Sequence, residues 1–288
     1  MEDLDLSVFE HADKAQWIQL AQDQLKGEDP LQKLRWNTGG IEELLPYYDQ
    51  SDIEDLGAQI SFFEALPPHR WKLFQRVVVK DERQANKEAL AALEGGCDGV
   101  IFEVDASCQK EALLTGINLE ICDVSLAGDQ TASWEGTFAS TRSNTYITSE
   151  IVSAISQVAD LMENATSNAY LVRPAFADFF LEIASVRALR YLLGKASEHH
   201  IHSSVPPHSS EEYQWFLNTT AGLASILGGS HSIELHTAIG DPRISRNVGN
   251  LIREESKIEI YSDQCGGSYL VESLTEKIIR GVKEALKK

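Results

Sequence analysis

After residue 70, short continuous apolar runs alternate along the chain with stripes in which an apolar residue recurs every three or four positions. Short apolar runs bounded by Gly, Pro or Asn predict buried strands, and the longer stripes predict helices. The predicted strands are 73–79, 99–104, 118–124, 169–174, 232–235 and 258–261. The predicted helices are 82–93, 108–114, 147–162, 179–194, 213–227, 244–255 and 269–286. The Ser, His and Pro residues of segment 197–210 predict a loop.

The first part of the chain lacks this alternation. One apolar stripe predicts a helix there, formed by Trp17, Leu20, Ala21 and Leu25. Residues 36–68 are irregular and contain Gly-Gly, Pro-Tyr-Tyr and Pro-Pro, which suits an extended segment lying on a surface. The pattern therefore predicts a helical and extended N-terminal arm over residues 1–68, followed by one domain over residues 69–288.

The order of strands and helices in residues 69–288 predicts the fold class. Strands that alternate with helices predict an α/β fold with a parallel sheet, because a parallel pair needs a crossover connection. The number of such units fits a (β/α)8 TIM-type barrel, complete or shortened. A doubly wound open sheet is the alternative. Its usual phosphate-binding signature, G-x-G-x-x-G after the first strand, is absent.

Charge and cysteine content restrict the partners and the compartment. With 25 Lys and Arg against 44 Asp and Glu, the net charge is −19, which works against nucleic acid and anionic membrane surfaces. The first ten residues carry no Lys or Arg, so they do not predict a secretory signal. The four cysteines have no C-x-x-C spacing and predict buried thiols in a reducing cytosol. A cytoplasmic protein is expected.

Two groups of residues are candidates for chemistry. The histidines His199, His200, His202 and His208 invite a zinc site, but a solvated loop is the favoured interpretation because no helix would hold the ligands in place. Glu103 and Asp105 follow the second predicted strand, at the edge where barrel enzymes have their active sites.

These acids could form an acid/base pair, but simple loop-capping acids are favoured. The glycines at 228–229 could bind an anion, although a helix cap and turn would need the same residues. Gly266-Gly267-Ser268, before the last predicted helix, has the same two interpretations. No motif among these residues names a reaction.

Four segments in the C-terminal half occur in an ordered, recognisable pattern. They are DFFLEIASVRALR at 178–190, LGGSHS at 227–232, RISRN…REES at 243–256 and GSYLVESLT at 267–275. They resemble the segments D-F-F-x-E-I-A-K-x-R-A-x-R, L-G-G-x-x-S, R-I-A-R-N…E-E-S and G-S-Y-x-V-E-x-L-T of the methylmalonyl-CoA mutase family. WNTGGI at 36–41 is similar to the W-x-T-x-E-G-I arm of that family.

The resemblance implies an N-terminal arm and a (β/α)8 barrel. In the family, adenosylcobalamin caps the barrel, the CoA chain threads its axis, and a radical rearrangement interconverts methylmalonyl-CoA and succinyl-CoA. The arm helps to hold the partner subunit. The family's R-x-T-Y segment, whose Arg contacts the substrate, resembles RSNTY at 142–146 with one residue more, so Arg142 is the implied substrate-binding residue.

The departures from the family pattern point to a lost activity. The motif D-x-H-x-x-G, whose His binds cobalt, the barrel motif G-Y-H and the threading segment P-Y-T-R-G are absent. Ser203-Ser204 stands where H-x-x-T-S is usual. We therefore expect a short, degenerate small (beta) subunit without the cobalamin-binding domain, with no catalytic residue, cofactor or metal of its own. Adenosylcobalamin and the chemistry would belong to a large catalytic subunit.

The expected assembly is a heterodimer with that large subunit, with Trp17, Tyr47 and Tyr48 of the arm as an exposed contact surface. The chain alone could form a homodimer. The alternative function is a stand-alone CoA-ester binding protein or enzyme that uses a remodelled barrel. Glu103, Asp105 and Arg142 would then line the mouth of the barrel.

Overall fold

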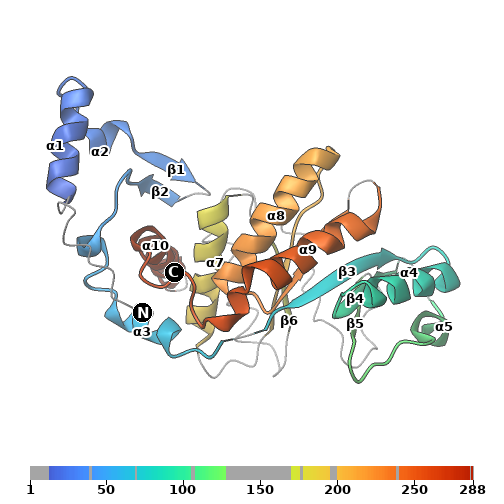
Figure 1. Ribbon diagram of the computed structural model, residues 1–288. Coiled ribbons are helices and arrows are strands. Elements are labelled where there is room, and N and C mark those ends of the chain that lie inside the picture. The colour runs from blue at the N-terminus through green and yellow to red at the C-terminus, as the bar shows by residue number, and fades with distance from the viewer. Residues whose placement is uncertain are drawn as a thin grey trace, which may run out of the picture.

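A computed structural model of the chain describes residues 13–38, 41–68, 70–104, 108–127, 170–175, 178–194, 200–237, 240–285 and 287. These residues form an α/β fold in which helices pack against the outer face of a curled parallel sheet (Figure 1). A small N-terminal region of helices and a two-stranded ribbon lies at one side of the sheet (Figure 1). No helix in these ranges is both long enough and apolar enough to cross a membrane.

The described strands of the sheet are all parallel to their neighbours. They are β3 (Lys72–Val78), β4 (Gly99–Glu103), β5 (Asp123–Ala127), β6 (Tyr170–Pro174), β7 (His200–Ser204) and β8 (Ser232–Glu234). Their spatial order is β5-β4-β3-β8-β7-β6, so β3 pairs with β8 and every other described pair is consecutive in the chain. Such an order runs round a circle, whereas a doubly wound sheet reverses at a switch point. The predicted α/β class and the TIM-type arrangement are confirmed for the part of the chain that the structure describes.

Two of the predicted elements are wrong. Segment 197–210, predicted as a loop, contains the strand β7, in which Ile201 is fully buried and the polar neighbours are hydrogen-bonded inside the sheet. Segment 258–261, predicted as a strand, is the 3-10 helix η3 (Ile258–Ile260). Lys257 has a φ of 50°, in the left-handed region, and this turn leads directly into η3 instead of an extended strand. The third strand also begins later than predicted, at Asp123.

Helices follow the strands and cover the outer face of the sheet. They are α4 (Glu82–Glu94), α5 (Lys110–Leu114), α7 (Phe179–Leu193), α8 (Glu211–Gly228), α9 (Pro242–Ser256) and α10 (Tyr269–Ala285). Side chains that accept a backbone N–H in the first turn fix the start of four of them, namely Asp81, Asp178, Ser210 and Asp241. The predicted helix 147–162 lies outside the described residues.

The main core lies between the sheet and these helices. Leu73 and Val77 of β3 join Val100 and Phe102 of β4 in one buried apolar cluster. The cluster also contains three alanines of α4, at positions 85, 89 and 92, whose small side chains let the helix approach the sheet closely. Because alternate residues of a strand point to opposite faces, the residues next to these in β3 and β4, such as Phe74, Arg76, Ile101 and Glu103, point to the inner face of the sheet.

The N-terminal region consists of short elements. They are α1 (Lys14–Gln24), α2 (Pro30–Lys33), the antiparallel pair β1 (Trp36–Thr38) and β2 (Ile41–Leu44), the 3-10 helix η1 (Gln50–Asp52) and α3 (Gly57–Glu64). Trp17 stacks on Tyr47 with 5.2 Å between ring centroids, and Tyr48 accepts a hydrogen bond from the backbone N–H of Leu45. The three rings are half-buried, so they are less exposed than predicted, and their role as a contact surface stays a prediction.

A buried arginine joins α3 to the barrel helices. Arg187 of α7 is 1% exposed and donates hydrogen bonds to Asp263 and to Glu272 of α10. Its guanidinium carbon lies 3.9 Å from the ring centroid of Phe63, and Gln59 donates to Glu272 at 2.6 Å. Helix α3 is therefore held against α7 and α10. The division between residues 1–68 and 69–288 stays a prediction.

Candidate functional site on the inner face of the sheet

The inner face of the sheet is polar where the outer face is apolar. Strands β3, β4, β5, β7 and β8 all contribute ion-paired or hydrogen-bonded side chains to it. The polar inward residues of these five strands are Lys72, Arg76, Glu103, Asp123, Ser125, His200, His202, Ser204, Ser232 and Glu234, and Phe74, Ile101 and Ala127 form a small apolar cluster on the same face. In a barrel of parallel strands, functional groups gather at the carboxyl ends of the strands, so this face is the candidate site.

Arg76 links three strands near that edge. Its Nε and Nη2 donate to the two carboxylate oxygens of Glu234 at 2.5 and 2.8 Å, and its Nη1 donates to Glu103 Oε2 at 3.3 Å. Burial alone would raise the pKa of Glu234, but the charge and hydrogen bonds of Arg76 and His202 hold that pKa well below its usual value. Glu234 is therefore a carboxylate whose charge Arg76 neutralises.

Two histidines and a serine continue this network along β7 and β8. Ser232 Oγ lies within hydrogen-bonding distance of both His200 Nε2, at 2.8 Å, and His202 Nδ1, at 2.7 Å. His202 Nε2 is 3.6 Å from Glu234 Oε2, and the Phe74 ring packs edge-on against the His202 imidazole. Burial, with smaller contributions from neighbouring positive groups, lowers the pKa of His200 to about 3, so it is neutral at physiological pH.

Ser232, His202 and Glu234 have the residue types of a catalytic triad, but their surroundings exclude that role in this fold. All three side chains are fully buried, and the Ser232 oxygen is shared by two imidazoles. A nucleophile must reach the carbonyl that it attacks. The network therefore stabilises the pairing of β7 and β8 rather than offering a nucleophile.

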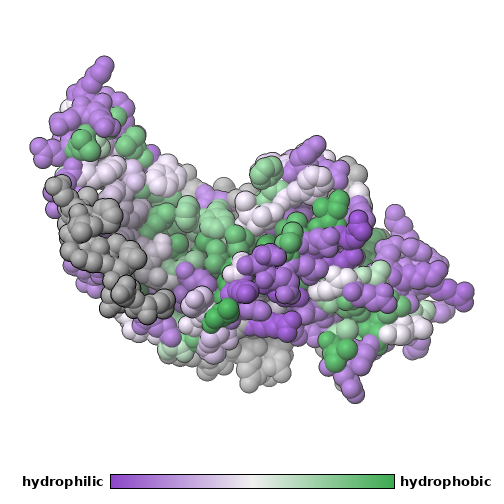
Figure 2. Space-filling view, in the orientation of Figure 1, coloured by the Kyte–Doolittle hydropathy of each residue, from purple (hydrophilic) through white to green (hydrophobic). Residues whose placement is uncertain are grey.

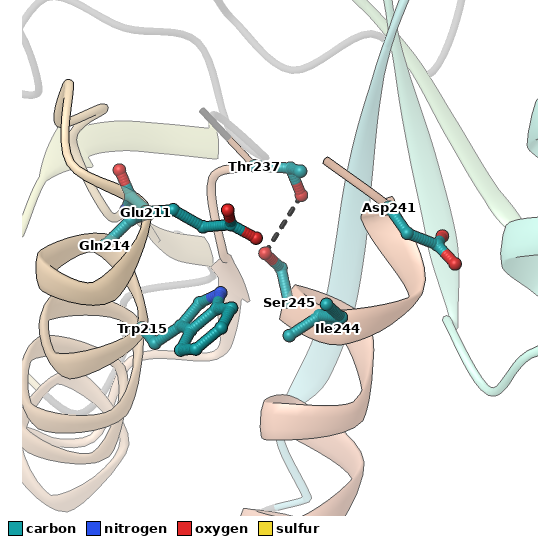
Figure 3. Close-up of a pocket in the computed structure, with 7 residues that line it drawn as sticks. All are labelled: Glu211, Gln214, Trp215, Thr237, Asp241, Ile244 and Ser245. Atoms are coloured by element: carbon teal, nitrogen blue, oxygen red, sulfur yellow. Dashed lines mark hydrogen bonds between the residues drawn. The ribbon is translucent and has the colours of Figure 1, made fainter. Parts of the chain in front are cut away.

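A small cavity opens beside this edge, where α8 and α9 begin. Its volume is about 220 Å3, counting the part that opens to solvent. Figure 3 shows the residues that line it: Glu211, Gln214, Trp215, Thr237, Asp241, Ile244 and Ser245. The Glu211 carboxylate points toward Ser245, whereas the Asp241 carboxylate points away from the other labelled groups (Figure 3). The cavity is therefore built from two helix starts and the segment that follows β8.

The structure places only some of the predicted site residues. Glu103 lies at the end of β4 and pairs with Arg76, whereas its predicted companion Asp105 lies outside the described residues. Arg142, the implied substrate-binding residue, also lies outside them. Gly229, with a φ of 99°, is the left-handed cap of α8, as the helix-cap interpretation predicts.

The histidine group is divided by the fold. His200 and His202 belong to β7, so the predicted solvated loop is wrong for them, and His199 lies outside the described residues. His208 packs against the ring of Tyr213 at a centroid distance of 4.3 Å. Within the described ranges, no three His, Cys, Asp or Glu side chains come together as a metal site would require.

Sequence reasoning missed the central pair of the site, Arg76 and Glu234. Each lies in a short strand that contains buried apolar residues, and a charged residue inside such a strand is a signal of an inward, paired charge. That signal identifies each residue as unusual but cannot pair them, because 158 positions separate them in the chain.

Comparison with known proteins supports the resemblance in the C-terminal part of the chain. Residues 173–288 match the family model described as methylmalonyl-CoA mutase. A probable mitochondrial methylmalonyl-CoA mutase of Caenorhabditis elegans is 34% identical over 125 residues, which cover 35% of this chain and 17% of that protein. The methylmalonyl-CoA mutase of Escherichia coli is 32% identical over 126 residues, covering 36% of this chain and 18% of that protein.

A relative described as a small subunit is also similar. The methylmalonyl-CoA mutase small subunit of Porphyromonas gingivalis is 31% identical over 141 residues, which cover 43% of this chain and 23% of that protein. The chain thus spans about a fifth of the length of the curated relatives that it matches. The predicted resemblance to the methylmalonyl-CoA mutase family is confirmed, over the segment that these matches cover.

Proposed function

We propose that this chain, whose residues 173–288 match the methylmalonyl-CoA mutase family, is a small, non-catalytic subunit of such a mutase. The isomerisation of methylmalonyl-CoA to succinyl-CoA, and the adenosylcobalamin that it needs, would belong to a large catalytic subunit. The similarity to the Porphyromonas gingivalis small subunit supports this role. The proposed assembly is a heterodimer, with a homodimer as the state of the chain alone.

The observation that carries the proposal is that the charged side chains of the inner face form ion pairs with one another. Arg76 donates hydrogen bonds to Glu234 and Glu103, and Lys72 forms an ion pair with Asp123 at 2.5 Å. Charged side chains that bind a charged substrate are usually free to contact it, because each ion pair within the protein that must first be broken weakens binding. Paired in this way, these charges act as cross-links between strands.

The histidines of the β7–β8 region, His200, His202 and His231, do not fit the role of a cobalt ligand. A ligating imidazole needs a ring nitrogen that faces the metal, oriented by a second hydrogen bond. His200 and His202 instead face Ser232 inside the sheet, and His231 Nδ1 accepts a hydrogen bond from the backbone N–H of Ile201. We therefore derive no step through the cofactor for this chain.

A cytoplasmic location forms part of the proposal. The cysteines Cys97, Cys108, Cys122 and Cys265 are all free thiols. Burial raises the pKa of the Cys97 thiol to about 12, which keeps it protonated and unreactive. Free, unreactive thiols suit a reducing compartment.

Co-expression with a full-length mutase large subunit from the same genome tests the proposal. We expect a heterodimer by size-exclusion chromatography with light scattering, and methylmalonyl-CoA isomerisation by the complex. The purified chain should show no turnover of methylmalonyl-CoA with or without adenosylcobalamin. Turnover by the chain alone, or micromolar binding of CoA esters to it, would favour the stand-alone enzyme or binding protein.

A variant of the inner face separates a structural role from a catalytic one. Glu103 is the most exposed acid of the Arg76 network, with a side chain that is 41% exposed. If the inner face is structural, Glu103→Gln should leave kcat of the complex within about twofold of the unaltered complex, because general acid–base residues contribute about 100-fold or more. A loss of that larger size would contradict a non-catalytic subunit.

A further inference from the structure

Helix α1 is attached to the rest of the molecule more weakly than the segment on which it lies. We propose that α1 is a strap, closed over Tyr47 and Asp52 in the free chain, which swings away when the large subunit binds to these two residues. The identity of the partner rests on the proposed function. The opening of the strap rests only on the contacts of α1 itself.

Two side chains of α1 close the strap. Lys14 Nζ donates to the two carboxylate oxygens of Asp52 at 2.7 and 2.8 Å. The Trp17 indole stacks on the Tyr47 ring, with 5.2 Å between the ring centroids and 19° between the planes. No residue of α1 is fully buried, and a helix of 11 residues is marginal without packing. One partly exposed ion pair and one stacked pair hold it weakly, so α1 can detach without unfolding the rest of the chain.

The segment under the strap is anchored more firmly. Leu44 is 2% exposed and belongs to the same apolar cluster as buried residues of α7 and α10. Ile53 is 5% exposed, and α3, which follows this segment, is held by Arg187 of α7. Tyr47 and Asp52 lie between the two buried residues in the chain. They therefore stay in place when α1 moves.

The connection between α1 and α2 suits a hinge. Helix α1 ends at Gln24, and α2 begins at Pro30, which is buried. Between them, Lys26 and Gly27 have φ angles of 59° and 90°, both in the left-handed region. Lys26 carries a Cβ atom and is strained in this conformation, so opening of the strap relieves the strain. Figure 1 shows α1 at the outer end of the N-terminal region, on the side away from the sheet, so its motion leaves the sheet undisturbed.

Opening of the strap uncovers an aromatic ring beside an acid. In the closed state Trp17 and Tyr47 cover each other, which is why these predicted contact residues are half-buried. The surface of α1 and α2 seen in Figure 2 is mostly hydrophilic, with a few apolar residues among the polar ones. Tyrosine side chains are frequent anchors of protein interfaces.

The strap itself shows which chemistry fits the uncovered residues. Lys14 and Trp17 present a cation beside an aromatic ring to Asp52 and Tyr47. A partner that takes the place of α1 would offer the same combination, a basic side chain next to an apolar one. A second copy of this chain is a poor candidate, because two chains with a net charge of −19 each repel one another.

Hydrogen exchange of the chain alone tests whether the strap opens. Exchange followed by mass spectrometry at low urea concentrations compares the amides of α1 with those of α7. We expect α1 to exchange by a local opening that hardly depends on urea, whereas α7 exchanges by global unfolding, which depends strongly on urea.

Lys14→Gln should raise the exchange rate of α1 about threefold or more and leave that of α7 unchanged. Lys33→Gln is the matched control, because the ion pair of Lys33 with Glu28 lies in the same region and its side chains are 45% and 59% exposed. It should leave the rate of α1 within about 1.5-fold. Unprotected amides in α1, the same urea dependence in α1 and α7, or equal rates in the two variants would overturn the proposal.

Association with the large subunit, measured by isothermal titration calorimetry, tests what the strap covers. Because the closed state cannot bind, the apparent affinity is proportional to the open fraction. Lys14→Gln should therefore strengthen association by about the factor by which it raises the exchange rate of α1, and Lys33→Gln should leave the affinity unchanged. Tyr47→Ala should weaken association about tenfold or more, since it removes the anchor. Circular dichroism checks that the variants fold.

The outcomes separate the strap from the proposed function. If the unaltered chain binds and Lys14→Gln weakens binding, α1 meets the large subunit in its closed position, and the strap is refuted although the proposed function stands. If the unaltered chain does not bind, the proposed function and this partner of the strap both fail, and the exchange experiment still decides whether α1 opens.

Discussion

Two ion-paired arginines hold different parts of this molecule together. Arg76 on the inner face binds Glu234 and Glu103, and Arg187 in the helix layer binds Asp263 and Glu272. The Arg187 side chain is 1% exposed, whereas that of Arg76 is 27% exposed. Arg187 joins α7 to α10 and α3, while Arg76 ties β3 to β8, the pair that brings the first strand of the sheet next to the last.

The difference shows which part of the fold is recognisable from motifs. Arg187 and both of its carboxylate partners lie within residues 173–288, the segment that matches the mutase family. Arg76 and Glu103 lie before that segment, and Glu234 lies within it. The helix-layer cluster is thus contained in one recognisable segment, whereas the inner-face cluster connects that segment to a part of the chain without a recognised pattern.

The largest expected effect is the loss of the helix-layer cluster. Arg187→Leu leaves Asp263 and Glu272 without their cation in a site closed to water, and should lower the free energy of unfolding by about 3–5 kcal/mol. Urea denaturation followed by circular dichroism measures this. Arg243→Leu is the matched control, because the Arg243 side chain is 68% exposed, and should cost less than about 1 kcal/mol. Equal losses in the two variants would remove the distinction between buried and exposed arginines.

Arg76→Met should have the next largest effect, about 3 kcal/mol, because it leaves the fully buried Glu234 without its cation. Its cost should be below that of Arg187→Leu, since Glu234 can take up a proton and the site lies nearer to solvent. The double variant Arg76→Met with Glu234→Gln should recover part of the loss, because the unpaired charge is gone. If the double variant is less stable than Arg76→Met, the ion pair is not the source of the stability.

Over the range from pH 7 to 5, the smallest expected effect is a pH dependence of the inner face. The pKa of His200 is lowered from 6.5 to about 3, so below pH 6.5 the unfolded chain binds a proton that the folded chain does not. Stability from this group is complete above pH 6.5 and should fall by at most about 1.4 kcal/mol per pH unit as the pH decreases toward 3. Urea unfolding at pH 7, 6 and 5 measures the slope.

His200→Gln should flatten this slope between pH 6.5 and 4.5. Below 4.5, the usual pKa of a glutamate, protonation of Glu234 in the unfolded chain adds a loss of the same sign. An unchanged slope in His200→Gln would mean that another group controls the acid sensitivity.

Local pattern was sufficient for most of the fold. The apolar run at 99–104 and the stripe at 82–93 coincide with β4 and α4, because each element buries one continuous apolar face and can be recognised without its neighbours. The same reasoning failed for β7, a strand with an inner face of His and Ser. Its polar side chains are satisfied by Ser232 and Glu234, which come from β8, so its composition resembles that of a loop.

The sequence alone determined most of the succession of strands and helices, the helix starts at Glu82 and Phe179, and the resemblance of the C-terminal half to a mutase. These depend on residues that are close together in the chain. Only the tertiary structure placed Arg76 against Glu234 and opened a cavity between α8 and α9. Both depend on the order of the strands in the sheet, which brings distant segments together and leaves buried charges stable only where the opposite charge lies beside them.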